Sequence, residues 1–228
     1  MPESFYLVAS HARKTPRFLV QFENMPKNTR ENPTVFIVDD DPAIRFAMQA
    51  LMDSVNLRHE IFGSGDDFLQ QVSEPRPGCL VLDIRMPGLG GLELQQELID
   101  RGNDLPIIFI TGHGDVPMAV EAMQKGAIDF IQKPFRDQEL LDRISEALKT
   151  NRERREEQQK HSEVAERVAK LTNREREVFD LVVTGKPNKV IAYELGVSQR
   201  TVEIHRARVM EKMQARSLAD LVKMHLVN

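Results

Sequence analysis

The chain of 228 residues contains one cysteine, Cys79, and no apolar run that approaches the roughly 18 residues of a membrane span. A single cysteine excludes an intrachain disulfide and a metal cluster held by several thiolates. Cys79 lies within an apolar stretch, which indicates a small core residue in a reducing compartment, so we expect a cytoplasmic protein. Hydrophobic residues make up 41% and charged residues 29%, which is typical of a packed protein rather than a disordered one.

The chain also lacks a strong charge of either sign, because its net charge of −4 combines two opposite halves. Residues 1–150 hold 15 Lys and Arg against 23 Asp and Glu, a net charge of −8, whereas residues 151–228 hold 16 against 12, a net charge of +4. This asymmetry indicates two parts with separate tasks, the second of which suits a polyanionic partner.

Residues 1–32 fit neither part, and we expect a flexible N-terminal extension there. The apolar stretch 5–8 is too short for a signal peptide, and the basic residues follow it instead of preceding it. Because Met25 precedes a polar stretch, translation from Met25 is the alternative interpretation.

Over residues 33–150, five short apolar stretches alternate with segments of helical periodicity. The stretches expected as strands are 35–38, 59–62, 79–82, 107–110 and 128–131, and each is followed by an expected helix. Continuous apolar runs are typical of strands that are covered on both faces. The pattern predicts an α/β domain with a doubly wound, five-stranded parallel sheet.

Polar side chains follow these strands: Asp39 and Asp40 after the first, Asp83 after the third, Thr111 after the fourth and Lys133 after the fifth. The carboxyl ends of parallel strands meet at one edge, where ligands bind. Clustered carboxylates there should recruit a hard divalent cation, Mg²⁺ or Mn²⁺. A hydroxyl and an ammonium suit the oxygens of a phosphoryl group, and a carboxylate can attack phosphorus to give an acyl phosphate. Taken singly, each residue could be an ordinary cap, turn or surface group, and we expect the neighbouring Asp41 to be a helix cap.

These residues carry a resemblance. Residues 33–150 resemble a two-component receiver domain in the motifs Val38-Asp39-Asp40-Asp41, Asp83-Ile84-Arg85-Met86-Pro87-Gly88, Ile110-Thr111-Gly112-His113-Gly114 and Lys133-Pro134-Phe135. The resemblance implies a flavodoxin-like fold in which Asp83 accepts phosphate from a histidine kinase. It implies that Asp40, Asp83 and the Arg85 carbonyl ligate Mg²⁺ directly while Asp39 acts largely through water, and that Thr111 and Lys133 bind phosphoryl oxygens. The Lys133–Pro134 bond would be cis.

The resemblance also marks positions that tune such a domain. Arg85 and His113 lie two residues past Asp83 and Thr111, where Arg85 either shields the phosphate or faces solvent, and His113 either handles protons or is inert. The switch aromatic on the fifth strand is Phe130, which lacks a hydroxyl, so packing alone would have to make the switch of Thr111 and Phe130 bistable.

Residues 151–170 are expected to form a helical linker. The first twelve are almost all polar, which favours a solvated helix. The alternative is a helix that continues the last receiver helix and pairs with a second copy, and too few heptads exist to decide.

Residues 171–228 predict four short helices, of which the first opens with the capping-box pattern Thr172–Glu175. A helix, the turn Gly196-Val197 and a helix capped by Ser198 follow, as in a helix-turn-helix unit. Basic residues on this last helix suit phosphates and base edges, although a helical bundle with a solvated basic face is the simpler alternative.

This region resembles the LuxR-type DNA-binding domain of FixJ- and NarL-like regulators, in Leu171-Thr172, Glu175-Arg176-Glu177-Val178, Ile191-Ala192 and Thr201-Val202-Glu203-Ile204-His205. The resemblance implies that the helix from Ser198 to Met213 enters the major groove and that the last helix, with Leu218, Leu221 and Val222, is a dimer contact. The expected DNA-binding residues are Ser198, Arg200, Thr201, Glu203, Ile204, His205, Arg206, Ala207, Arg208 and Lys212. Many relatives have lysine at Glu203, which leaves the operator sequence open.

The sequence thus predicts a phosphorylation-switched transcriptional regulator and not an enzyme. Its expected partners are a sensor histidine kinase, double-stranded DNA, a second copy of the chain and RNA polymerase. Two alternatives remain: a Mg²⁺-dependent phosphohydrolase, in which Arg85 would stand where haloacid-dehalogenase-like enzymes have a second Asp, and a regulator whose receiver is never phosphorylated.

Overall fold

A computed structural model describes residues 32–112 and 116–227 of the chain. The described residues divide into two compact units, the first up to residue 152 and the second from residue 153. The predicted extension up to residue 31, the alternative start at Met25 and the tuning position His113 lie outside the described residues.

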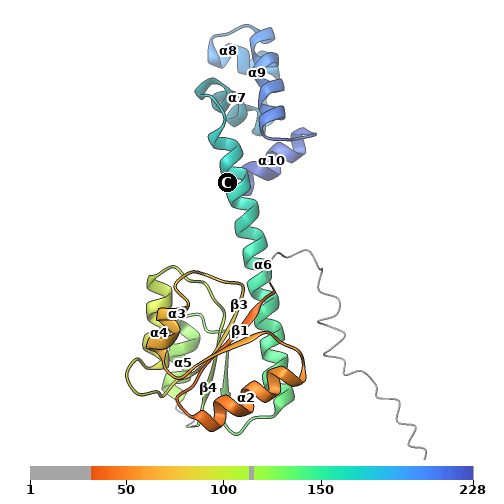
Figure 1. Cartoon of the computed structure of the whole chain (residues 1–228). Helices are drawn as coiled ribbons and strands as arrows, with labels where there is room; N and C mark the ends of the chain where they lie inside the picture. Colours follow the sequence, from red (N-terminus) through yellow and green to blue (C-terminus); the bar gives the residue numbers. More distant parts are fainter. Residues whose placement is uncertain (1–31, 113–115, 228) are drawn as a thin grey trace, which may run out of the picture. The chain divides into compact units, whose positions relative to one another are not determined.

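The first unit is built on a sheet of five parallel strands (Figure 1). Along the chain these strands are β1 (Thr34–Val38), β2 (His59–Phe62), β3 (Gly78–Asp83), β4 (Ile107–Thr111) and β5 (Asp129–Gln132). Their order in the sheet is β2-β1-β3-β4-β5, so the central strand is β3, which ends at Asp83. The winding direction reverses between β1 and β3, and ligands of such sheets bind outside the carboxyl ends at this point.

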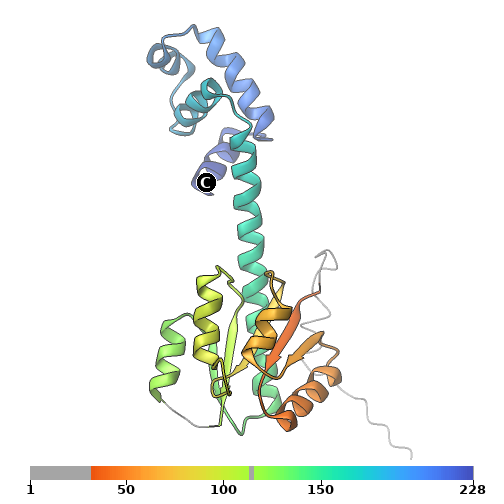
Figure 2. The same cartoon turned by 60° about the vertical axis from the view of Figure 1, so that its left-hand side comes forward.

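Helices cover both faces of the sheet, as the alternation of strands and helices predicted (Figures 1 and 2). On one face lie α3 (Gly65–Gln71), α4 (Gly91–Asp100) and α5 (Val116–Gln124). On the other lie α2 (Pro42–Ser54) and the first part of α6 (Asp137–Ala169). The predicted fold class is therefore confirmed.

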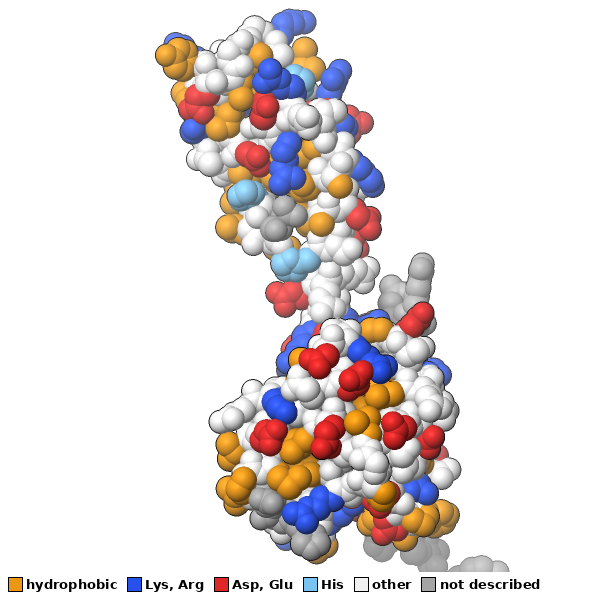
Figure 3. Space-filling model, turned by 90° about the vertical axis from the view of Figure 1, so that its left-hand side faces the viewer, with side chains coloured by type: hydrophobic (Ala, Val, Ile, Leu, Met, Phe, Trp, Pro, Cys, Tyr) orange, Lys and Arg blue, Asp and Glu red, His pale blue; other side chains and the backbone are white. Residues whose placement is uncertain are grey.

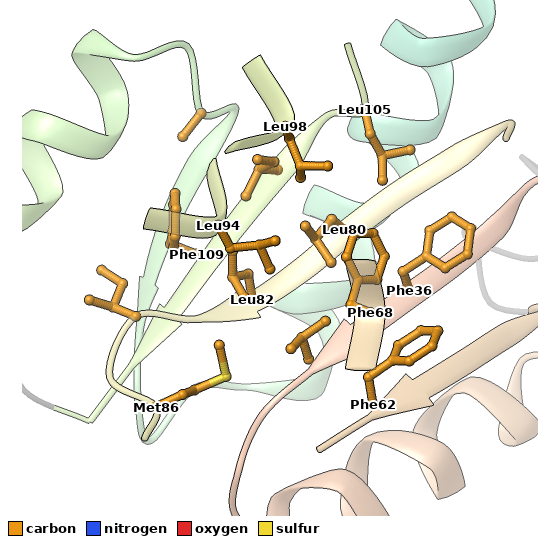
Figure 4. Packing of buried hydrophobic residues seen from close by; sticks show 14 of the residues in the cluster. Phe36, Phe62, Phe68, Leu80, Leu82, Met86, Leu94, Leu98, Leu105 and Phe109 are labelled. Atoms are coloured by element: carbon orange, nitrogen blue, oxygen red, sulfur yellow. The ribbon is translucent and has the colours of Figure 1, made fainter. Parts of the chain in front are cut away.

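Each face of the sheet has its own hydrophobic core, because successive residues of a strand point to opposite faces. In the core under α3 and α4, the ring of Phe68 meets those of Phe36 and Phe62 edge to face, with centroids 5.7 and 5.3 Å apart (Figure 4). Leu80 and Leu82 of β3 lie in the same core. Strands β1 and β3 are buried along their whole length, so their carboxyl ends are held rigidly.

Small differences separate the predicted elements from the observed ones. The fifth strand begins one residue later than predicted, at Asp129. The carboxylate of Asp41 accepts a hydrogen bond of 2.8 Å from the backbone N–H of Ala43, which confirms Asp41 as the cap of α2.

The second unit contains α7 (Asn173–Val183), α8 (Asn188–Leu195), α9 (Gln199–Lys212) and α10 (Leu218–Val227). Gly196 ends α8 with a left-handed φ of 66°, a conformation that glycine adopts without strain, and Ser198 then caps α9. Buried Val202 and Val209 hold α9 on the core of this unit. The predicted capping box of Thr172 and Glu175 opens α7.

Residues 151–169 of the predicted linker form the later part of α6. Residues 156–163 are exposed, whereas Val164 and Val168 are buried in the core of the second unit. Part of the predicted linker therefore belongs to that core. Among the described residues, no helix is both long enough and apolar enough to cross a membrane.

Candidate functional site

The carboxylates at the ends of β1 and β3 form a cluster. Parallel pairing of Val38 with Leu82 brings the two strand ends side by side. Oxygen atoms of Asp39, Asp40 and Asp83 all lie within 4.8 Å of one another. Asp39 is fully buried and Asp83 is 8% exposed, whereas Asp40 is exposed. The predicted convergence of these three side chains is thus what the structure has.

Lys133, from the end of β5, reaches into this cluster. Its Nζ donates to Asp39 Oδ2 at 2.7 Å and to Asp83 Oδ2 at 3.0 Å. The backbone N–H of Lys133 donates to the carbonyl of Thr111 at 2.7 Å, which links the ends of β5 and β4. The Lys133–Pro134 peptide bond is cis, as predicted.

Burial and hydrogen bonds act in opposite directions on the ionisation of this group. Desolvation by burial raises the pKa of Asp39, although hydrogen bonds from Lys133 and from the Asp41 N–H oppose the rise. Burial by itself would lower the pKa of Lys133, but its hydrogen bonds to Asp39 and Asp83 outweigh burial, so the pKa is raised and the ammonium persists at neutral pH.

The donor set fits a hard divalent cation. With all three carboxylates ionised, Lys133 neutralises one negative charge and leaves two, which matches one Mg²⁺ ion. All three potential ligands offer oxygen, which Mg²⁺ prefers over nitrogen or sulfur.

The backbone around the cluster is held by contacts that the sequence did not indicate. Arg45, in the first part of α2, donates from Nη1 to the carbonyl of Asp39 at 2.7 Å. The N–H of Arg85 donates to Asp83 Oδ1 at 3.3 Å. At Gly91 a Cβ atom would lie 2.3 Å from the carbonyl oxygen of Asp83, so only glycine lets α4 begin against this strand end. The glycine at the start of the predicted helix was a sequence signal for the close approach of α4 to Asp83. No sequence signal indicated the hydrogen bond from Arg45 to the carbonyl of Asp39.

The two predicted switch residues lie on neighbouring strands. Thr111 ends β4 and is 2% exposed, one position beyond the residue that pairs with Asp83. Phe130 of β5 pairs with Phe109 and is partly buried against the core under α3, α4 and α5. The side chain of Thr111 is therefore buried, and that of Phe130 is partly shielded from solvent.

The second candidate site is the surface of α9. Six of the predicted DNA-binding residues are exposed there, namely Ser198, Arg200, Glu203, Ile204, Ala207 and Arg208, and the remaining four, Thr201, His205, Arg206 and Lys212, are half-buried. Arg206 Nη1 donates to Asn188 Oδ1 at 3.0 Å and so ties α9 to α8.

Lys212 makes its contacts inside the second unit. Its Nζ donates to the buried carboxylate of Glu175 at 2.5 Å and to the carbonyl of Lys170 at 3.1 Å. Hydrogen bonds from Lys212 and from the Thr172 N–H lower the pKa of Glu175 to about 2. The charge of Lys212 is thus engaged in fixing the C-terminal end of α9, a role that the sequence did not indicate.

Both units of the chain match known protein families. Residues 35–145 match the response regulator receiver domain, and residues 169–225 match the luxR family of bacterial regulatory proteins. Nodulation protein W of Bradyrhizobium diazoefficiens is 50% identical over 190 residues, which span 83% of this chain and 84% of that protein. Transcriptional regulatory protein FixJ of Azorhizobium caulinodans is 45% identical over 197 residues, 86% of this chain and 93% of that one.

Two solved structures are similar to this chain over most of its length. The response regulator StyR is 44% identical, with a TM-score of 0.78 over 87% of this chain and 100% of that one. Full-length FixJ from B. japonicum is 40% identical, with a TM-score of 0.54 over 86% of this chain and 96% of that one.

These matches exclude one of the two functional alternatives that the sequence left open. Receiver domains bind Mg²⁺ through acidic residues and take phosphate from a histidine kinase, and a LuxR-type domain binds DNA. The family consists of regulators and not of enzymes, which rules out the phosphohydrolase. The chain therefore belongs to the two-component response regulators that join a receiver domain to a LuxR-type helix-turn-helix domain, and it regulates transcription in a phosphorylation-dependent manner.

Proposed function

We propose that Asp83 is the phosphoacceptor of a receiver domain formed by residues 33–150, which a helical linker (151–170) joins to a DNA-binding domain formed by residues 171–228. The single observation that supports this assignment best is the position of Lys133 Nζ, 2.7 Å from Asp39 and 3.0 Å from Asp83. Asp83 is slightly exposed whereas Asp39 is fully buried, so Asp83 is the better placed of the two to meet an incoming phosphoryl group.

The reaction needs a nucleophile and groups that receive negative charge. A carboxylate oxygen of Asp83 bonds to the phosphorus of a kinase phosphohistidine while the P–N bond breaks, and the imidazole leaves with the electron pair of that bond. The ammonium of Lys133 exchanges a carboxylate contact for a phosphoryl oxygen, and the hydroxyl of Thr111 donates to another. Asp39, Asp40, Asp83 and the carbonyl of Arg85 would hold Mg²⁺ or Mn²⁺. The metal would offset the excess negative charge as the phosphoryl group arrives.

Phosphorylation promotes dimerisation through the surface of α5. Val116, Val120 and Met123 are 70%, 49% and 45% exposed, and their spacing of four and three residues places them on one side of the helix. Figure 3 faces this side of the first unit and shows hydrophobic side chains gathered on it. Movement of Thr111 and repacking of Phe130 would rearrange this apolar surface, and a second copy of the chain would cover it.

Dimerisation brings two α9 helices to two half-sites of an operator, and the phosphate contacts of both add. The exposed side chains of Arg200 and Arg208 would hold phosphates, and those of Glu203, Ile204 and Ala207 would face bases. RNA polymerase is the expected partner of the bound dimer. Both the kinase domain that donates phosphate and the operator lie in the cytoplasm, where this function places the protein.

The test uses acetyl phosphate as phosphodonor in the presence of Mg²⁺. Wild-type protein is expected to shift on a Phos-tag gel and to dimerise in light scattering, whereas Asp83→Asn does neither. Asp67→Asn, which changes an exposed carboxyl on α3, is the matched control and should behave as wild type. A phosphorylated Asp83→Asn variant, or an unchanged dimer fraction in that variant, would overturn the assignment. A wild-type protein that takes up no phosphate would support the alternative of a receiver that is never phosphorylated.

A further inference from the structure

A buried glutamine joins the two helices that follow the site. Gln95 of α4 is 1% exposed, and its Nε2 donates to the backbone carbonyl of Ala122, in α5, at 3.1 Å. Its Oε1 is buried and has no hydrogen-bond partner among the described residues. Its neighbours Leu94 and Leu98 lie in the apolar core under these helices (Figure 4), and Ala122 belongs to the same core.

An amide in this position destabilises the fold relative to an apolar side chain of similar length. A buried acceptor without a partner has lost its hydrogen bonds to water and gained none, whereas methionine would fill the same space with no polar atom. The one contact that the amide does make joins α4 to the last turn of α5. Gln95 therefore fixes the position of α5 relative to α4 instead of adding stability.

The contact holds the C-terminal end of α5. The carbonyl of Ala122 also accepts from the N–H of Ala127 at 3.1 Å, so the C-terminal end of α5 is fixed from two directions. At the N-terminal end, Val116 is 70% exposed, and only residues 112–115 separate it from Thr111. Met118, in this half of α5, is partly buried against the core, so a shift of Thr111 would meet α5 at its more exposed end.

The fixed end is in turn connected to the acidic cluster through α4. The N–H of Gly91, the first residue of α4, donates to the carbonyl of Ile84 at 2.9 Å, next to Asp83. Gln95 lies about one helical turn further along the same helix. One rigid helix therefore runs from the phosphoacceptor loop to the contact that holds α5.

We propose that Gln95 is a positioning residue that makes the C-terminal end of α5 a pivot. When Thr111 moves, α5 turns about the Gln95–Ala122 contact, and its N-terminal half, with Val116 and Val120, is displaced more than Met123. The apolar surface of α5 then moves as one rigid body, and the helix keeps its packing on the core. This inference rests on the proposed dimerisation through α5.

The experiment compares Gln95→Met with Gln96→Met, the same substitution at the next position, where the side chain is half-exposed and bonds Asp100. In the full chain, the dimer dissociation constant is measured by sedimentation with and without acetyl phosphate. Gln95→Met is expected to melt at or above the wild-type temperature and to be phosphorylated at the wild-type rate. Its ratio of dimer dissociation constants, unphosphorylated to phosphorylated, should fall at least tenfold, while Gln96→Met keeps the wild-type ratio.

Hydrogen exchange provides a second readout that does not depend on dimerisation. In unphosphorylated Gln95→Met, amides of residues 123–127 should exchange at least tenfold faster than in wild type, and those of β3 should not change. If wild type takes up phosphate but stays monomeric, dimerisation fails as a proposal, and exchange of α5 still tests the pivot. Should Gln95→Met fold poorly, Gln95→Leu replaces it in both measurements. Unchanged exchange at 123–127 together with a wild-type dimerisation ratio would overturn the inference.

Discussion

Replacing Lys133 by methionine should change metal binding and phosphoryl transfer in opposite directions. The ammonium of Lys133 occupies the cluster as a competing cation, 2.7 Å from Asp39 and 3.0 Å from Asp83. Without it, the three carboxylates attract Mg²⁺ more strongly, so affinity for the metal rises. Phosphoryl transfer falls because the group that neutralises a phosphoryl oxygen is gone.

The magnitudes follow from the burial of the two carboxylates. Removing one partner of a buried ion pair costs about 3–5 kcal/mol. Because burial already raises the pKa of Asp39, that group can take up a proton, and we expect the lower limit, about 3 kcal/mol, in the absence of metal. Mg²⁺ at a hundred times its dissociation constant stabilises the variant by about 2.7 kcal/mol, which brings it close to the stability of metal-free wild type. A tenfold gain in Mg²⁺ affinity corresponds to about 1.4 kcal/mol, and the loss of one charge-stabilising donor slows transfer by about 10²–10³-fold.

Three measurements check these effects: calorimetric titration with Mg²⁺, amide exchange of peptides from β1 and β3 with and without Mg²⁺, and the rate of phosphorylation by acetyl phosphate. Lys125→Met is the matched control, because Lys125 pairs with Glu121 on the surface of the receiver and such pairs contribute no more than about 1 kcal/mol. Weaker Mg²⁺ binding by Lys133→Met than by wild type, or phosphorylation at the wild-type rate, would refute the reasoning.

Three further outcomes are expected. The folded-state pKa of Glu175 is about 2 against an ordinary 4.5, so its stabilising effect is complete above about pH 5 and is lost as the pH falls towards 2; Glu175→Gln should be less stable than wild type at pH 7 and lose less of its stability between pH 5 and 2, as measured by circular dichroism. Arg45→Ala should weaken Mg²⁺ binding about tenfold in calorimetry, because it frees the carbonyl of Asp39, and Arg45→Lys should restore part of the affinity. Glu203→Lys should strengthen binding to unrelated DNA, and each new phosphate contact should steepen the slope of log K against log salt by about 0.9 in fluorescence anisotropy; an unchanged slope would show that residue 203 lies away from the backbone.

The parts of the site that stand at strand ends were predictable because their signals are local. An apolar run such as 35–38 followed by acidic residues indicates a buried strand that delivers carboxylates to one edge, and parallel pairing then brings Asp39 next to Asp83. The same holds for the caps at Asp41 and Ser198, where a short polar side chain directly precedes a helical pattern. In each case, the residue and the structure that it stabilises lie within a few positions of each other.

Long side chains were not predictable in this way. We expected Lys212 among the DNA-binding residues, and nothing in the sequence indicated that its Nζ contacts Glu175, which lies 37 residues earlier in the chain. Arg45 donates to the carbonyl of Asp39, and no periodic pattern in the sequence indicates this contact. The tertiary structure determines which group such a flexible side chain contacts. The residue type alone predicts only a charged side chain in solvent.

The burial of Gln95 follows from a local pattern, whereas its contact with Ala122 depends on the tertiary structure. Leu94 and Leu98 mark the buried side of α4, and Gln95 stands one position after the first and three before the second, so it lies on that same side. A polar residue on an apolar stripe must find a partner or lose stability. Such a residue, on the helix that begins beside the proposed phosphoacceptor, is a candidate for coupling rather than for chemistry. It makes a directional contact where an apolar side chain would hold the helices together without specifying how they move.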